Sequence, residues 1–164
     1  MTEQPLATGA VLRPDDGSAY WFLGSLATVK ISGEQTRDRL TLMEFVNPPG
    51  FAPPAHRHLR QDEVFYILSG AARFRCDGED FEAREGDVVF LPVGSVHTFL
   101  VLGDEPLRTL QITVPAGFED FAAEAGEPAG RRELPEPGPV DPAALQAAAA
   151  RHDIEIVGPP PSDL

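Results

Sequence analysis

The sequence predicts an all-β sandwich or barrel that is followed by short C-terminal helices. About nine short apolar segments rich in β-branched and aromatic residues follow one another, and turn signals separate them at intervals of about 8–12 residues. This spacing leaves no room for the helices that alternate with strands in βαβ units. After residue 115 alanine and proline become frequent, and apolar residues take up helical spacing.

The length of 164 residues suits one domain with a substantial core. We expect a lead-in over residues 1–18, a strand-rich barrel over residues 19–115 and an extension over residues 116–164 that packs on the barrel. The expected strands are two within 19–32, then 39–47, 63–69, 71–76, 80–83, 88–91, 96–102 and 107–114.

Turn-forming residues set the boundaries of these strands. In chain order the boundaries are Asp15-Asp16-Gly17, Gly24, a polar turn over 32–38, Pro48-Pro49-Gly50, Gly70, Asp77-Gly78, Gly86-Asp87, 92–95 and 103–106. Asp-Gly between two strands is a strong hairpin signal, so the strands on either side of residues 77–78 are expected to pair. Residues 51–54 are expected to run extended, because proline and the residue before it avoid the helical region.

Two helices and an edge strand are expected in the C-terminal extension. Phe118, Phe121, Ala122 and Ala125 have helical spacing, and Gly126 follows as a stop signal. After a proline-rich link, Asp141-Pro142 has the pattern of an N-cap and first helical position, which predicts a helix to about residue 152. His152 is interpreted as a cap that complements the helix dipole. Residues 153–157 alternate and predict an edge strand.

Composition excludes several classes of partner. The formal net charge of −13 and the pI near 4.6 are unfavourable for binding a phosphate backbone, so no nucleic acid is expected. The N-terminus has no basic segment followed by an apolar one, and no run approaches the roughly 18 apolar residues of a membrane span. We therefore expect a cytoplasmic protein that binds no membrane. Cys76 is the only cysteine and is interpreted as a small core residue on a strand.

The residues that carry chemistry lie between Gly50 and Gly70. His56 and His58 are two apart on an extended segment, so their side chains point to the same face. Glu63 follows five residues later, and a turn between them can bring its carboxylate to the same point. Two imidazoles and one carboxylate form the donor set of a transition-metal site. The alternatives are surface histidines on a loop and, for Glu63, a solvated carboxylate or a general base.

A second motif follows, and the two together resemble those of the cupin superfamily. The first is Gly-x5-His-x-His-x4-Glu-x6-Gly over residues 50–70, and the second is Gly-x5-Pro-x-Gly-x2-His over residues 86–97. The second motif of the family usually ends in Asn four residues after its histidine, where this chain has Val101. The resemblance implies a double-stranded β-helix, which is a jelly-roll barrel.

The resemblance also implies a metal and its ligands. One divalent transition metal, Fe, Mn, Ni, Co or Zn, would be bound by His56, His58, Glu63 and His97. The alternative for His97 is a core histidine with satisfied hydrogen bonds. Glu63 would also be the catalytic base, because a carboxylate between metal and substrate is well placed to take a proton. Apolar residues on the same strand faces predict a substrate cavity; the expected substrate-binding residues are Phe45, Phe65, Ile67, Phe99 and Val101.

Within that superfamily, the C-terminal segment resembles small single-domain bacterial proteins that are similar to quercetin 2,3-dioxygenase. This implies a metal-dependent dioxygenase acting on a hydrophobic, aromatic or flavonol-like small molecule. The alternatives are an isomerase, cyclase or lyase that uses the metal as a Lewis acid without O₂, and a small-molecule-binding protein without catalysis. We also expect a homodimer, with the apolar residues Tyr20, Trp21 and Phe22 in its interface.

Overall fold

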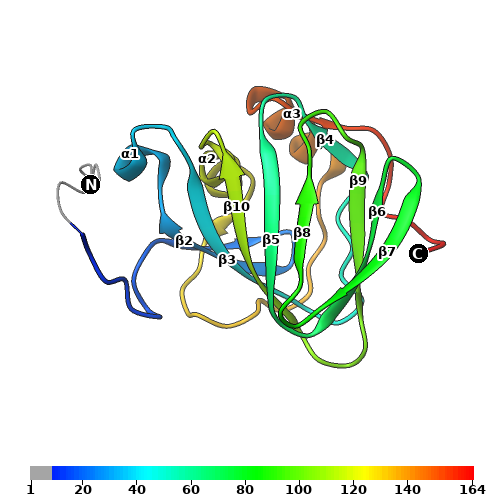
Figure 1. Cartoon of the computed structure of the whole chain (residues 1–164), viewed down its shortest axis with the longest axis horizontal. Helices are drawn as coiled ribbons and strands as arrows, with labels where there is room; N and C mark the ends of the chain where they lie inside the picture. The colour runs from blue at the N-terminus through cyan, green and yellow to red at the C-terminus, as the bar shows by residue number, and fades with distance from the viewer. Residues whose placement is uncertain (1–8) are drawn as a thin grey trace.

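The computed structural model describes residues 9–164, so the first eight residues of the expected lead-in lie outside the described part. Residues 9–18 hold no strand or helix. The rest folds into two antiparallel β-sheets with three helices (Figure 1). In chain order the elements are β1 (Ala19–Phe22), β2 (Ser25–Ile31), α1 (Gly33–Thr36), β3 (Thr41–Asn47), β4 (His56–His58), β5 (Asp62–Ser69), β6 (Ala71–Cys76), β7 (Glu79–Arg84), β8 (Val88–Leu91), β9 (His97–Leu102), β10 (Leu107–Val114), α2 (Phe118–Ala125), β11 (Glu127–Pro128), α3 (Pro142–Arg151) and β12 (Ile154–Ile156).

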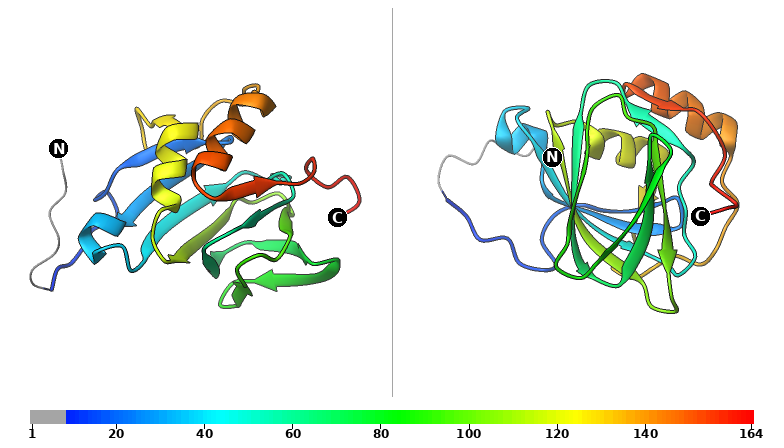
Figure 2. Two further views of the ribbon diagram at one scale, coloured as in Figure 1. Left: turned by 90° about the horizontal axis from the view of Figure 1, so that it is seen from above. Right: turned by 45° about the vertical axis from the view of Figure 1, so that its right-hand side comes forward.

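The two sheets face each other and form a barrel-like sandwich, as the two views in Figure 2 show. The larger sheet has the strand order β11-β1-β2-β3-β10-β5-β8, and the smaller has the order β12-β4-β9-β6-β7. All the strand pairs are antiparallel. The all-β fold predicted from the sequence is confirmed, and β12 is the edge strand expected over residues 153–157.

One expected turn is wrong: residues 32–38 contain the short helix α1. Ser32 accepts a hydrogen bond from the Gln35 backbone N–H, and the Gln35 side chain accepts one from the Ser32 N–H. This reciprocal capping box satisfies two N–H groups that a short helix leaves free. The helix ends at Arg37, which has a left-handed backbone conformation with φ of 57°.

The C-terminal extension adds strands to both sheets. β11 pairs with β1 at Tyr20 and Trp21. β12 pairs with β4, and its residues lie opposite His56 and His58. The Trp21 indole N–H also donates to the Glu133 carbonyl at 2.9 Å. Phe22 is buried in the core. Of the residues expected in a dimer interface, Phe22 is thus buried within the chain, while Tyr20 and Trp21 are half-buried beside β11.

The core has two clusters of buried apolar residues. The first lies between the larger sheet and helices α2 and α3; its aromatic members are Phe22, Phe45, Phe118 and Phe121. The second lies between the two sheets around Phe74, whose exposed fraction is 0% and whose ring contacts Phe65 and Phe99. Cys76 is half-buried and packs against this second cluster, close to the expected core position.

Not every strand residue expected in the core is buried. Phe90 lies in the apolar segment predicted as a strand over residues 88–91, but 58% of its surface is exposed. β8 alternates, so Val89 and Leu91 point inward while Val88 and Phe90 point outward. Among the described residues, no helix has the length and apolar character that crossing a membrane requires.

Candidate metal centre

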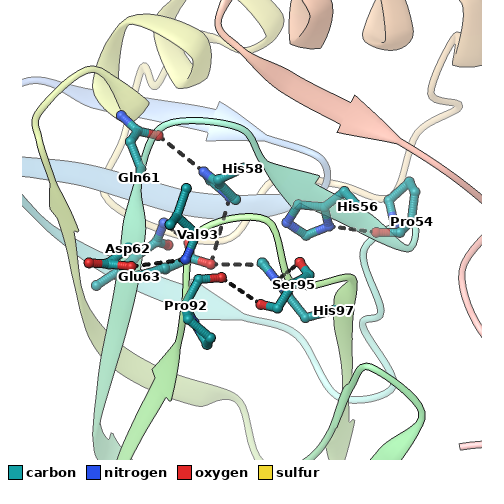
Figure 3. Close-up of polar contacts among 11 residues, drawn as sticks. Pro54, His56, His58, Gln61, Asp62, Glu63, Pro92, Val93, Ser95 and His97 are labelled. Carbon is teal, nitrogen blue, oxygen red and sulfur yellow. Dashed lines mark hydrogen bonds and ion pairs between the residues drawn. The ribbon is translucent and has the colours of Figure 1, made fainter.

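Four side chains from both sheets converge at one point (Figure 3). His56 and His58 lie on β4 and His97 on β9, all in the smaller sheet, while Glu63 lies near the start of β5 in the larger sheet. Each offers one ligand atom, and these four atoms lie within 4.8 Å of one another. The structure thus brings together all four residues that the sequence predicts as ligands.

Local sequence explains how β4 reaches this position. The prolines before it keep the chain extended, and β4 then pairs with β9 so that His56 is opposite His97. The backbone N–H of Gly94 donates to the carbonyl of His58 at 2.8 Å, and Asp62 accepts from the Val93 N–H at 2.9 Å. These two hydrogen bonds connect the turn of the second motif, which holds Val93 and Gly94, to His58 and Asp62, the two ends of the segment that joins β4 to β5.

A hydrogen bond fixes the Nδ1 atom of each histidine. His56 Nδ1 lies 2.7 Å from the carbonyl oxygen of Pro54, and His97 Nδ1 lies 3.0 Å from that of Ser95. His58 Nδ1 lies 3.0 Å from Oε1 of Gln61. A neutral imidazole that donates from Nδ1 has a lone pair on Nε2. All three rings are therefore oriented to offer Nε2 as a ligand.

The donor atoms that remain fit a metal ion. Nε2 of His58, Nε2 of His97 and Oε2 of Glu63 are buried and have no hydrogen-bond partner among residues 9–164. Glu63 Oε2 lies 3.0 Å from His97 Nε2 and 3.7 Å from His58 Nε2. Buried polar atoms are rarely left without a partner. A divalent transition metal among these atoms would satisfy them all, and three imidazoles with one carboxylate suit such an ion.

The electrostatics of the site favour the protonation states that bind a metal. Burial, followed by the neighbouring His97 and His58, lowers the pKa of His56 to about 3. Burial acts to raise the pKa of Glu63, but His58 and His97 outweigh it and lower that pKa to about 2. At neutral pH the imidazole of His56 is therefore neutral and the carboxylate is charged, so a metal displaces no proton from either.

We expect the metal-free protein to lose stability in acid. The folded-state pKa of His56 lies below its ordinary value of 6.5, so the unfolded chain binds a proton that the folded chain does not. The free energy of unfolding should therefore fall by about 1.4 kcal/mol for each pH unit from 6.5 towards 3. Glu63 contributes stability above pH 4.5, which is lost between 4.5 and about 2. Urea unfolding at pH 7, 5.5 and 4 measures this fall. A His56→Asn variant should show a shallower fall, and an equal fall would contradict the assignment.

Two glutamines that the sequence analysis missed hold the ligands in place. The Gln61 amide accepts from His58 Nδ1 and donates to the carbonyl of Ala116 at 3.0 Å. Gln111, on β10, donates to Glu63 Oε1 at 2.5 Å, which leaves Oε2 directed at the histidines. Gln61 lies within the first motif, so it could have been predicted from the sequence as a hydrogen-bond partner for a histidine. Gln111 lies 48 positions from Glu63, and only the pairing of β10 with β5 brings it near.

Replacing Gln61 by Leu should weaken metal binding by about 10–100-fold, the range typical of residues that orient a metal-binding histidine. The leucine keeps the buried volume but leaves the His58 ring without its Nδ1 partner. Competition with a chromophoric chelator measures the metal dissociation constant. Gln146→Leu, at an exposed position on α3, is the matched control and should leave the constant unchanged. An unchanged constant in Gln61→Leu would show that Gln61 has no orienting role.

A mainly apolar cavity adjoins the four residues. Its volume is about 70 Å³, and it shares walls with an outer recess of about 620 Å³. His56, Glu63 and His97 line one part of it. Its other lining residues are Phe22, Leu23, Ser25, Phe45, Asn47, Phe51, Pro53, Pro54, Phe65, Phe99, Gln111, Phe118, Phe121, Leu145, Ile154 and Ile156.

Three of the five expected substrate-binding residues line this cavity: Phe45, Phe65 and Phe99. Ile67 and Val101 do not; they are buried in the second core cluster. Each is on the expected strand, four residues beyond a predicted ligand, and packs inside the second core cluster instead of reaching the cavity. Phe65 and Phe99, only two residues from Glu63 and His97, are close enough to form the wall.

The C-terminal extension forms the opposite wall of the cavity. Phe118 and Phe121 of α2, Leu145 of α3, and two isoleucines of β12 contribute to it. The sequence predicted the extension's helices but gave no indication that they close the cavity. The outer recess is lined by Pro142 and by residues 156–160 as well, so the extension surrounds the approach to the site.

Comparisons with known proteins agree with this geometry. A family model described as the cupin domain matches residues 43–113. The chain is 32% identical over 75 residues to an uncharacterized protein of Methanocaldococcus jannaschii, 33% identical over 67 residues to an oxalate-binding protein of Thermotoga maritima and 26% identical over 125 residues to a quercetin 2,3-dioxygenase of Bacillus subtilis. These matches cover 46%, 41% and 76% of this chain, and 60%, 55% and 37% of the relatives' own lengths.

Solved structures with the same fold include KdgF from Halomonas sp., with a TM-score of 0.60 and 17% identity. The match covers 69% of this chain and 99% of that chain. A predicted oxalate decarboxylase from Thermotoga maritima has a TM-score of 0.59 and 24% identity, over 65% of this chain and 99% of that chain. At these identities the similarity concerns the fold.

Proposed function

The chain belongs to the cupin superfamily, and from this premise we propose that it is a metal-dependent dioxygenase acting on an aromatic, flavonol-like small molecule. The observation that carries the proposal is that three members of the four-residue cluster, His56, Glu63 and His97, lie at the wall of a cavity lined by phenylalanines. A flat aromatic ring packs favourably against such walls. The similarity to quercetin 2,3-dioxygenase over 76% of the chain supports the proposed reaction.

In the proposed reaction, the residues of the site would have distinct roles. His56, His58, Glu63 and His97 would hold one divalent metal, which when bound supplies positive charge and an open position for substrate or O₂. Glu63 would take the proton of a substrate hydroxyl, since it is buried at the cavity wall and ionised at neutral pH. Gln111 would keep Oε2 of Glu63 directed into the site. The phenylalanine walls would exclude water.

A second candidate is a binding protein without catalysis. The specific support is the 33% identity to an oxalate-binding protein, although that match covers only 41% of this chain. The four-residue cluster suits this role too, because a bound metal can hold a small oxygen-containing ligand. The apolar character of the cavity argues against a small dianion and in favour of the aromatic substrate. A metal-dependent isomerase, cyclase or lyase would use the same residues without O₂.

Incubation of iron-, manganese-, nickel- or cobalt-loaded protein with quercetin separates these functions. We expect the flavonol absorbance to fall while an oxygen electrode records consumption of one O₂ per molecule of quercetin. Turnover under anaerobic conditions would indicate the isomerase or lyase class. Stoichiometric retention of ligand without product would indicate the binding protein. An unchanged flavonol spectrum with every metal would count against the dioxygenase.

We also propose that two copies of the chain associate through the outer face of β5 and β8. Tyr66, Val88 and Phe90 are exposed there, and Tyr66 lies opposite Val88 across the two strands. Exposed apolar side chains grouped in this way favour association, because contact with a second copy removes their apolar surface from water. Light scattering should give a dimer mass for the wild type and a monomer mass for Phe90→Glu. The control Val140→Glu, at another exposed valine, should remain a dimer. A wild-type monomer would refute this proposal.

A further inference from the structure

Two polar side chains in the cavity have no role in the candidate metal centre. Apart from the metal-binding cluster and Gln111, the polar residues that line the cavity are Ser25 and Asn47. Both are almost fully buried, with exposed fractions of 1% and 3%. Polar groups in an apolar pocket usually fix the orientation of a ligand. Their position therefore bears on what the cavity binds.

Ser25 and Asn47 lie at the end of the sheet opposite the metal-binding cluster. Glu63 is opposite Thr113 on β10, and Thr113 is opposite Thr41, the first residue of β3. Asn47 is the last residue of β3, and Ser25 begins β2. Phe45 lines the cavity beside Asn47 on the same strand. A ligand whose one end is at the metal would thus meet this pair with its other end.

The hydrogen bond within the pair determines which groups remain free. The Ser25 hydroxyl donates to Asn47 Oδ1 at 2.8 Å. Within the described residues, neither N–H of the Asn47 side-chain amide has an acceptor, and nothing donates to Ser25 Oγ. Two N–H donors on Asn47 and one oxygen acceptor on Ser25 are therefore available side by side. A hydroxyl group matches both, because it accepts one hydrogen bond and donates another.

We propose that Asn47 and Ser25 form a specificity subsite that selects aromatic ligands bearing a hydroxyl group at the end remote from the metal. The hydroxyl oxygen would accept from the Asn47 amide, and its hydrogen would be donated to Ser25 Oγ. A ligand without the hydroxyl would leave a buried amide unpaired, which disfavours its binding. This inference rests on the proposed function, since it concerns the same cavity and an aromatic ligand.

The test compares p-cresol with p-xylene, two single-ring probes that differ by a hydroxyl in place of a methyl group. NMR titration of the zinc-loaded protein gives both dissociation constants and follows the Asn47 side-chain amide resonance. We expect p-cresol to bind about 10-fold more tightly, which corresponds to about 1.4 kcal/mol, and to shift that resonance. In Asn47→Leu the preference should fall to about one. If the leucine variant does not fold, Ser25→Ala serves as the second test. It removes one hydroxyl and little volume, and it should reduce the preference.

Thr109→Val is the matched control, because Thr109 is fully buried on β10 but does not line the cavity. It should keep the wild-type preference. A wild-type preference near one, a preference that survives in both Asn47→Leu and Ser25→Ala, or no binding of either probe would overturn the subsite. The outcome is separable from the proposed function: discrimination between the probes without flavonol turnover would refute the dioxygenase alone, and turnover without discrimination would refute the subsite alone.

Discussion

Glu63→Gln is expected to lower the affinity for the metal more than 100-fold and therefore to abolish any metal-dependent activity. The glutamine has the shape of the glutamate, but the Gln111 amide, which donates to Oε1, will hold the new carbonyl oxygen in that position. The amide nitrogen, which is no metal ligand, then faces the three imidazoles. Changes to residues that only orient a ligand weaken binding by about 10–100-fold, so loss of a ligand should exceed that.

Metal content and chelator competition measure the effect of Glu63→Gln. Glu63→Asp keeps the charge but shortens the side chain and should bind with intermediate affinity. Glu79→Gln, at an exposed position on β7, is the control and should bind as the wild type does. Circular dichroism of the metal-free proteins shows whether each variant folds. A Glu63→Gln variant with wild-type metal content would exclude Glu63 as a ligand.

Phe74→Ala is expected to lower the free energy of unfolding by about 3–5 kcal/mol, the range for truncation of a buried phenylalanine. Phe74 has no exposed surface, and its ring contacts those of Phe65 and Phe99 at centroid distances of 5.6 and 5.2 Å. The alanine leaves a cavity directly behind two residues of the binding cavity. Binding of p-xylene should therefore weaken as well, since the wall can collapse into the space.

Urea unfolding of the metal-free protein at pH 7 measures the stability of Phe74→Ala. The matched control is Phe81→Ala, because Phe81 stacks on Phe74 at 5.8 Å but is 38% exposed. Its truncation removes less buried apolar surface and should lower the free energy of unfolding by less than half as much. Equal losses in the two variants would show that the second core cluster does not depend on Phe74.

The strands and the four predicted ligands could be recognised from local sequence. Turn signals bound the strands, and the spacing of His56, His58, Glu63 and His97 follows a motif that needs no knowledge of distant contacts. Gln111 could not be recognised, because its place beside Glu63 follows from the pairing of β10 with β5.

Strand faces were harder to assign where both faces are apolar. In β8 all four residues, Val88, Val89, Phe90 and Leu91, are apolar, so hydrophobicity does not show which of them face the core. Only packing decides that Phe90 points outward. The helical capping of residues 32–36 was overlooked because a turn and a single helical turn share the same polar composition. The cavity wall formed by α2, α3 and β12 depends on how the extension folds back, which no local pattern encodes.

The most direct test of the metal centre is the metal content of the purified protein by mass spectrometry, beside the double variant His56→Ala, His58→Ala. We predict close to one transition metal ion per chain in the wild type and almost none in the variant, because the variant removes two of the four converging ligands. Iron, manganese, nickel or cobalt would favour the dioxygenase, and zinc would favour a Lewis-acid reaction. Little metal in the wild type even after loading, or equal metal in both proteins, would contradict the account and leave the histidines with a structural role.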